Sequence, residues 1–340
     1  MLSPQDSVIT QESCLAKKQV NFTQGVFMYL DTYPNPTLKS QSKAFLRKCY
    51  RKLQALFGQN DFVPSGHFYS PIANAKEIEE GIAHRSYNPL DLRGIDLHLE
   101  DQKKLLQNFA RFYVEMPFTE EKQPHLRYYF NNQAYCHSDG ICLYSMIRYL
   151  KPKKIIEVGS GFSSALMHDV RELFFAANGG GDIESFEITH IEPYPALLKS
   201  LLKPNDLKHL HLLPTRLQEV DITLFQTLES NDILFIDSTH ISKINSDVNA
   251  IFFEILPLLK SGVYIHFHDI FYPFSYPNDW LRAKNSWNEA YILRAFLSFN
   301  NTFEIVFFNT CLNYLYPDEF ATALPLSQKN KGGSIWLKKL

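Results

Sequence analysis

Acidic and histidine side chains gather in two short segments, NDILFIDSTH and SGVYIHFHDIFYP. Asp237 follows an apolar run in the first segment, and His268 and Asp269 follow a similar run in the second. Adjacent parallel strands lie about 4.8 Å apart, so we expect these three side chains to meet at one edge of a sheet. Two carboxylates and an imidazole could hold a divalent metal or work as an acid/base pair.

If no metal binds, the general base would be His240 or His268, because imidazole titrates near neutral pH. Each histidine taken alone could equally be a hydrogen-bonded structural residue. Beyond Asp269, the aromatic run YPFSYPNDW predicts either a lid over a cleft or a packed loop. The candidate substrate contacts in and after this run are Trp280, Trp287, Asn288 and Glu289.

A glycine-rich turn lies within KKIIEVGSGFSS, residues 153–164. Gly159 and Gly161 have no β-carbon, so the backbone there can adopt unusual dihedral angles and a flat ligand can lie against it. Glu157 precedes the first glycine, and helix-forming residues follow the turn. The alternative is a turn that only lets a helix pack on a strand.

The turn resembles the first cofactor motif of the class I S-adenosylmethionine-dependent methyltransferases, in which the acid before the glycines faces the methionine end of the cofactor. A dinucleotide-binding strand also ends in GxGxxG. Here, however, the third glycine position is Ser164, and an acid inside the strand is not part of that fingerprint. The resemblance implies that the cofactor contacts include Glu157, Gly159, Ser160, Gly161 and Ser163.

A parallel sheet is needed to position these residues. Apolar runs alternate with helical periodicity, which predicts an α/β, Rossmann-like doubly wound sheet with its ligand beyond the carboxyl ends of the strands. A helix over about 138–149, capped by Ser138 or Asp139, leads into it. The predicted strands are 154–158, 187–191, 210–213, 232–236, 262–267, 303–309 and 334–339.

The last two predicted strands, FEIVFFN and SIWLKK, differ from the others. The connection between them contains Pro317 and Pro325, ends in Gly332 and Gly333, and shows no clear crossover helix. We therefore expect a seven-stranded sheet whose last strand is antiparallel. Class I methyltransferases carry such a strand, and classical dinucleotide-binding domains do not.

Further candidate cofactor contacts follow the second, third and fourth strands. In ITHIEPYP, Glu192 can offer two acceptor oxygens to both ribose hydroxyls, although it could also be a plain surface acid. Gln218 lies where this fold contacts adenine, and Asp237 is a further candidate. The catalytic residues, which would orient and deprotonate the methyl acceptor, would be His240, His268 and Asp269.

Whether a metal binds at the ends of the fourth and fifth strands remains open. In metal-dependent methyltransferases resembling catechol O-methyltransferase, carboxylates at these strand ends hold magnesium. Here the candidate ligands are Asp237, His268 and Asp269, and a hard cation prefers oxygen to the imidazole of His268. Magnesium, a softer ion such as manganese or zinc, and no metal at all are the alternatives.

The composition excludes some classes of protein. The chain has 340 residues, 45% of them hydrophobic, and a formal charge of −2, which gives no general attraction for nucleic acid. Its five cysteines form no C-x-x-C pair, so neither a disulfide framework nor a zinc knuckle is indicated. With no signal peptide and no apolar run long enough to span a bilayer, we expect a cytoplasmic protein. Homo-oligomerisation stays open.

We expect two parts: a mainly helical extension, residues 1–120, that contributes to the substrate cleft, and a methyltransferase domain, residues 121–340. The extension includes an amphipathic helix within 37–60 whose polar face is basic over residues 39–52. That face could meet phosphate groups or an anionic membrane, or it could simply be solvated. The loop GHFYSPI could line the cleft or act as a buried hinge.

From residue 66 onward the chain resembles a bacterial group of predicted class I methyltransferases. The matching segments include HFYSPI, KKIIEVGSGFSSALM, FIDSTH, EILPLLKSGVYIHFHDIF and GGSIWLKK. The resemblance implies methyl transfer from S-adenosylmethionine to an oxygen, or less readily a nitrogen, of a small molecule or glycan. The alternatives are a nicotinamide-dependent oxidoreductase and a catalytically silent nucleotide-binding interaction module.

Overall fold

The computed structural model describes residues 62–84, 92–175 and 186–340. Contacts divide the chain into two compact units, residues 1–73 and 74–340. The basic helix predicted within 37–60 lies outside the described residues. In the first unit, the segment GHFYSPI has no helix or strand and exposes Phe68 and Tyr69.

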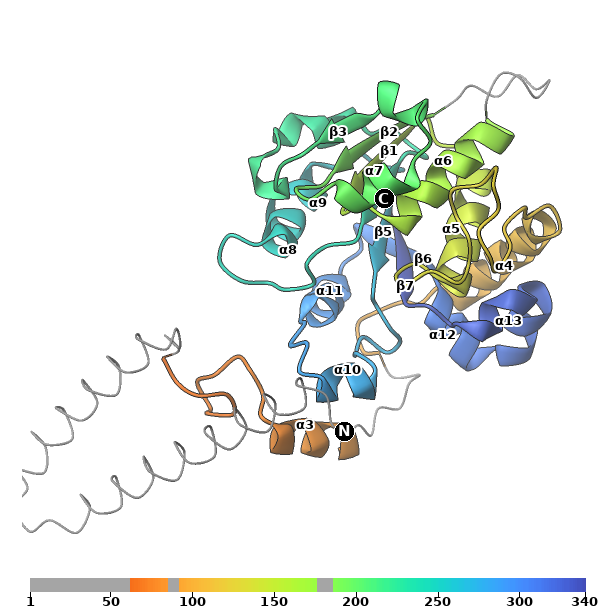
Figure 1. Cartoon of the computed structure of the whole chain (residues 1–340). Helices are drawn as coiled ribbons and strands as arrows, with labels where there is room; N and C mark the ends of the chain where they lie inside the picture. Colours follow the sequence, from red (N-terminus) through yellow and green to blue (C-terminus); the bar gives the residue numbers. More distant parts are fainter. Residues whose placement is uncertain (1–61, 85–91, 176–185) are drawn as a thin grey trace, which may run out of the picture. The chain divides into compact units, whose positions relative to one another are not determined.

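A seven-stranded sheet forms the centre of the second unit (Figure 1). The strand order is β3-β2-β1-β4-β5-β7-β6; β7 is antiparallel to both of its neighbours, and the other adjacent pairs are parallel. The strands are β1 (Lys154–Val158), β2 (Glu187–Ile191), β3 (His211–Leu213), β4 (Ile233–Ile236), β5 (Tyr264–His268), β6 (Phe303–Phe308) and β7 (Ser334–Lys339). The predicted fold class and its antiparallel last strand are confirmed.

Helices cover both faces of this sheet (Figure 1). The helices on one face are η3 (Leu217–Glu219), η4 (Ile222–Thr227), α8 (Asp247–Ala250), the π-helix η5 (Ile251–Ile255), α9 (Leu256–Leu258) and α11 (Glu289–Leu297). The helices on the other are α4 (Leu99–Tyr113), α5 (His137–Leu150), α6 (Phe162–Phe174) and α13 (Pro317–Ala323). The remaining helices are α3 (Ala75–Ala83), α7 (Ala196–Leu201), η2 (Asp206–Lys208), α10 (Asn278–Arg282), α12 (Asn309–Leu315) and η6 (Pro325–Lys329).

Strand periodicity decides which side chains face α5 and α6. Successive side chains of a strand point to opposite faces. In β1, Ile156 and Val158 belong to the apolar cluster with α8 and α11, whereas Ile155 belongs to the cluster with α5 and α6. Glu157 therefore shares the face of Ile155. By the same alternation, His268 at the end of β5 lies on that face too.

Two local predictions were wrong. Neither Ser138 nor Asp139 caps α5: the N-cap residue is Cys136, and its side chain makes no capping hydrogen bond. The connection between β6 and β7, where no clear helix was expected, contains α12, α13 and η6. Pro317 and Pro325 stand in the first turns of α13 and η6, where proline is tolerated, so the prolines mark helix starts rather than loops.

Helix α4 packs within the same compact unit as the sheet. Gln102 of α4 donates to the carbonyl of Leu97 and accepts from the backbone N–H of Phe308 in β6 at 2.7 Å. The predicted boundary near residue 120, and the contribution of the first 120 residues to a cleft, stay predictions. Among the described residues, no helix has the length and apolar character needed to cross a membrane.

Candidate active site

The glycine turn leaves β1 between the ends of β2 and β4. Gly159 has φ = +79°, a region that L side chains rarely adopt, and a β-carbon there would lie 2.1 Å from the carbonyl oxygen of Asp237. Its N–H donates to the carbonyl of Ile191 at 3.0 Å. Glycine is therefore required at this position by the backbone packing itself.

Gly161 has a different role, because its φ of 175° is extended backbone that any residue adopts. A β-carbon there would meet only the side chain of Leu197, at 3.4 Å. Its N–H donates to the hydroxyl of Ser164 at 3.0 Å. Gly161 thus starts α6 and keeps the side of the turn toward α7 free of a side chain.

Glu192 lies against this turn, as its position at the end of β2 predicts. One carboxylate oxygen accepts the backbone N–H of Ser160 at 3.0 Å, and the other accepts that of Tyr194 at 2.7 Å. The carboxylate is half-buried, and the ring of Tyr194 beside it is 84% exposed. A carboxylate has about four lone-pair positions, so Glu192 can accept further hydroxyl donors.

Glu157 and Ser163 lie beneath the turn. Glu157 is fully buried, and its oxygens accept from the hydroxyls of Ser163 at 2.7 Å and Ser164 at 2.5 Å. His190 contacts the same carboxylate at 2.6 Å. In this structure both carboxylate oxygens have protein partners, and cofactor contact by Glu157 and Ser163 stays a prediction.

Gln218 lies in η3 and donates to the carbonyl of Asn245 at 2.8 Å. The two residues before it have other contacts: Leu217 is buried in the core, and Arg216 pairs with Glu219. Adenine contact by Gln218 therefore also stays a prediction.

His268 at the end of β5 is surrounded by carboxylates. Its Nδ1 lies 3.2 Å from Asp237 Oδ1, and its Nε2 lies 3.6 Å from Asp139 and 3.8 Å from Asp269. Burial alone would lower the pKa of His268, but the carboxylates, Asp237 first, raise it well above the ordinary value. His268 is thus held as a charged donor, and the expected meeting of Asp237, His268 and Asp269 is observed.

Sequence reasoning missed Asp139 as a member of this group. It lies in the first turn of α5, where an acid looks like an ordinary helix-capping residue. In the folded chain it accepts from the backbone N–H of Gly333 at 3.1 Å and from Asn309 at 3.0 Å. Burial works against its ionisation, yet the interaction with His268 lowers the pKa of Asp139 overall.

His240 is the second histidine of the site. Its Nδ1 lies 2.8 Å from Glu289, and its Nε2 lies 3.4 Å from Asp269 and 3.6 Å from Asp237. Burial opposes protonation of His240, but the hydrogen bond to Glu289 and the nearby carboxylates raise its pKa. Glu289 is fully buried and accepts from Ser238 as well, so it orients the ring from behind.

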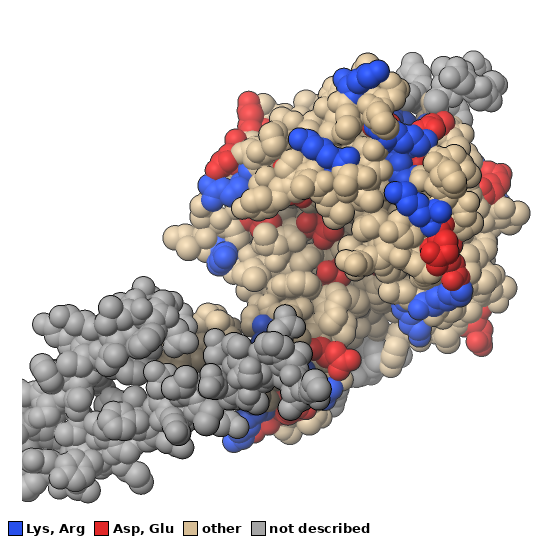
Figure 2. Space-filling view, viewed as in Figure 1, with Lys and Arg blue, Asp and Glu red and all other residues tan. Residues whose placement is uncertain are grey.

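Backbone strain and aromatic packing also mark this edge of the sheet. His240 and Asp269 both have positive φ, 59° and 57°, which is uncommon for residues other than glycine and often found at functional sites. The ring of Trp287 lies 4.6 Å from that of His240, and Trp280 packs edge-to-face on Trp287 at 5.2 Å. Figure 2 shows acidic side chains within a hollow in the middle of the visible face.

The residues at this edge do not fit a divalent metal. Among residues 62–84, 92–175 and 186–340, no group of three or more histidine, cysteine, aspartate or glutamate side chains could hold an ion. A protonated imidazole has no lone pair to donate, so His268 is a poor ligand. The predicted set of Asp237, His268 and Asp269 is better described as an ion-pair cluster.

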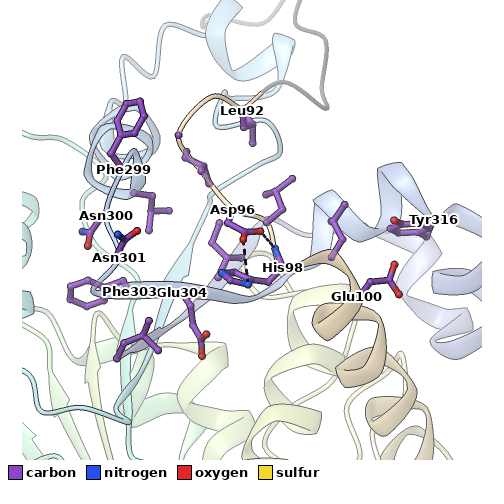
Figure 3. A pocket seen from close by; sticks show the side chains of 17 residues that line it. Leu92, Asp96, His98, Glu100, Phe299, Asn300, Asn301, Phe303, Glu304 and Tyr316 are labelled. Carbon is purple, nitrogen blue, oxygen red and sulfur yellow. Dashed lines mark hydrogen bonds and ion pairs between the residues drawn. The ribbon is translucent and has the colours of Figure 1, made fainter.

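A separate cavity of about 930 Å³ lies in the same unit, between the segment 92–100 and the start of β6 (Figure 3). Asp96 and His98, whose Oδ2 and Nδ1 lie 3.8 Å apart, line it together with Phe299, Phe303 and Tyr316. None of the predicted site residues contributes to its wall.

Two sequence comparisons find similar proteins. A family model described as a methyltransferase domain matches residues 156–270. An uncharacterized protein of Archaeoglobus fulgidus is 35% identical over 177 residues, which cover 50% of this chain and 75% of that protein.

Two solved structures are similar at low identity. The SAH-bound methyltransferase PaMTH1 of Podospora anserina is 15% identical, with 80% of this chain and 99% of that chain covered and a TM-score of 0.39. A DUF574 family protein from Streptomyces avermitilis is 11% identical, with 79% and 98% covered and a TM-score of 0.36.

The matched residues 156–270 run from β1 through the glycine turn to the residues that follow β5. They include Glu157, Glu192, Asp237 and Asp269, and they lie within a sheet whose last strand is antiparallel. The chain belongs to the class I S-adenosylmethionine-dependent methyltransferases.

Proposed function

We propose that this protein transfers a methyl group from S-adenosylmethionine to a hydroxyl oxygen, and less readily to a nitrogen, of a small molecule or glycan. The observation that carries the proposal is the position of Glu192, whose carboxylate is held against the glycine turn by the N–H of Ser160. A carboxylate with free acceptor capacity beside a turn without side chains suits a ribose with two hydroxyls. S-Adenosylmethionine, when bound, supplies a methyl group on an already activated sulfonium.

On the cofactor side, Glu192 would accept the ribose hydroxyls, and the backbone of Gly159, Ser160 and Gly161 would lie against the ligand. The exposed ring of Tyr194 next to Glu192 offers an apolar surface for a nucleoside. The protein mainly has to hold the reacting groups in line and exclude water, because the donor needs no further activation.

On the acceptor side, His240 would remove the hydroxyl proton through Nε2. Glu289 fixes the ring at Nδ1, and Asp237, whose side chain is 33% exposed, can orient the acceptor. A raised pKa makes His240 a stronger base in its neutral form. His268 would stay protonated and hold Asp237 and Asp269 in place, while Trp280 and Trp287 would form one wall for the acceptor.

Three measurements on the full chain test the proposal. S-Adenosylhomocysteine should raise the melting temperature, because a ligand that binds only the native state stabilises it by mass action. Glu192→Ala should abolish that shift, whereas Asp269→Ala should keep it and lose turnover. An unchanged shift in Glu192→Ala would contradict the ribose contact. Binding without S-adenosylhomocysteine production from any hydroxyl acceptor would favour the silent interaction module.

A further inference from the structure

We propose that a directed chain of hydrogen bonds, from Arg171 through His168 and His190 to Glu157, positions the glycine turn for cofactor binding. We call these four residues the Glu157 chain. The inference rests on the proposed function, since it concerns how the same turn is held. It makes His168, His190 and Arg171 positioning residues, a role that no motif in the sequence assigns to them.

The Glu157 chain is continuous and buried. Glu157 and His190 face each other as register partners of β1 and β2, with His190 Nδ1 at 2.6 Å from the carboxylate. His190 Nε2 lies 3.1 Å from Nε2 of His168, and the two rings are nearly parallel at 12°. Arg171 Nη2 lies 3.0 Å from His168 Nδ1. Glu157 and His190 are fully buried, and His168 is 3% exposed.

The contacts admit one arrangement of protons. A guanidinium can only donate, so its contact with His168 places a lone pair on Nδ1 of that ring. Nε2 of His168 then carries the proton and donates to Nε2 of His190. Because that nitrogen accepts, the proton of His190 lies on Nδ1 and is donated to Glu157. Both histidines are neutral, and every donor in the series points toward the carboxylate.

The carboxylate of Glu157 connects these histidines to the glycine turn through hydrogen bonds. Glu157 accepts from the hydroxyls of Ser163 and Ser164 at the start of α6. Ser164 Oγ in turn accepts the N–H of Gly161 at 3.0 Å. The neighbouring N–H, that of Ser160, is donated to Glu192. Four elements, β1, β2, α6 and the turn, therefore share one hydrogen-bonded centre directly beneath the proposed ligand.

A nearby ionic cluster shows what a purely structural arrangement looks like. Arg127 is buried and pairs with Asp169, Glu172 and Asp206 at 2.7 Å each. Asp169 of this cluster also lies on α6, but its partners are Arg127 and the backbone N–H of Tyr128, not residues of the turn. The Glu157 chain differs because it ends on hydroxyls that hold the turn itself.

The test compares two substitutions of His190 in the full-length protein, with S-adenosylhomocysteine affinity measured by calorimetry. His190→Leu removes the donor to Glu157 and should weaken binding about tenfold or more, as expected for losing a hydrogen bond to a charged group. His190→Asn keeps an amide donor near the position of Nδ1 and should restore affinity to within about threefold of the wild type. Val170→Ala, a buried change on the same helix, should lower the melting temperature without weakening binding.

Wild-type affinity in His190→Leu, or an equal loss of affinity in Val170→Ala, would overturn the proposal. An independent measurement uses the wild type with ¹⁵N-labelled histidine, whose ring nitrogen shifts report the tautomers. We expect the proton on Nδ1 of His190 and on Nε2 of His168; any other assignment overturns the directed chain, whether or not a ligand binds. If the tautomers are as expected and the wild type does not bind S-adenosylhomocysteine, the proposed function fails and the positioning role fails with it.

Discussion

Two pairs of buried histidines lie at different depths along the same sheet, and the groups that surround them differ. His168 and His190 lie beneath the glycine turn: His190 contacts the carboxylate of Glu157, and His168 contacts His190. His268 at the end of β5 and His240 after β4 lie among four carboxylates, which belong to Asp139, Asp237, Asp269 and Glu289. All four histidines are buried.

Burial alone does not decide the charge of these rings. Desolvation, followed by the neighbouring His190 and Arg171, lowers the pKa of His168 to about 2. Desolvation also acts on His240 and His268, yet carboxylates raise the pKa of both. The charge of the neighbouring groups therefore decides the protonation of a buried histidine. Next to Arg171 the ring of His168 stays neutral, whereas carboxylates favour the protonated form of His240 and His268.

The largest expected effect is on catalysis and concerns His240. His240→Gln removes the proposed base, so turnover should fall about 10²- to 10⁴-fold, the usual contribution of general base catalysis. S-Adenosylhomocysteine affinity should stay within a few-fold of the wild type, because His240 has no contact with the turn. The measurement is single-turnover production of S-adenosylhomocysteine. Normal turnover in this variant would place the proton transfer elsewhere.

The next effect is on stability and concerns Glu157, the buried carboxylate beneath the turn. Glu157→Ala leaves the donors of Ser163, Ser164 and His190 without their acceptor, so the free energy of unfolding should fall by about 3 kcal/mol or more. Urea denaturation measures this. The control is Glu192→Ala, at a half-buried position, which should change it by less than about 1 kcal/mol. Equal losses in both variants would argue against a special role of the buried carboxylate.

The pH dependence of stability should have opposite signs at the two pairs. The folded pKa of His268 is raised, so its stabilisation is complete below the unfolded pKa of about 6.5 and is lost as pH rises through the folded pKa. The folded pKa of His168 is lowered. As pH falls below about 6.5, the unfolded chain therefore binds a proton at His168 that the native state does not bind, and the native state loses stability. That costs up to about 1.4 kcal/mol per pH unit.

Two variants separate these contributions in denaturation experiments between pH 5 and 9. The stability deficit of His268→Asn relative to the wild type should shrink toward high pH. His168→Gln should gain on the wild type as pH falls below 6. Parallel curves for the wild type and both variants would show that the two pairs do not differ in charge.

The smallest effect is a shift in the pH profile of turnover. The hydrogen bond from Glu289 raises the pKa of His240, so Glu289→Gln should lower that pKa. Because the neutral ring is the base, the acidic limb of the profile should move to lower pH. An unmoved limb would mean that another group sets the profile.

The regular elements were predictable because their signal is local. The runs KIIEV, EITHI and SIWLKK were predicted at the residues where β1, β2 and β7 occur. Apolar periodicity reflects burial on a sheet, and it survives without knowledge of the partner strands. The positions of Asp237, His268 and Asp269 at strand ends followed from the same signal.

What the sequence could not determine is how side chains from distant segments pair. Asp139 was predicted as a helix cap, which was wrong. Cofactor contact by Glu157 and substrate contact by Glu289 stay predictions, and neither gave the pairing with His190 or His240. Only the register of β1 against β2 brings His190 to Glu157, and only the packing of α5 and α11 brings Asp139 and Glu289 to the two histidines. Residue types and spacing thus determined the family, the sheet and the edge that carries the chemistry. The tertiary structure decided which acids are satisfied and which histidines are charged, because both depend on contacts between residues far apart in the chain.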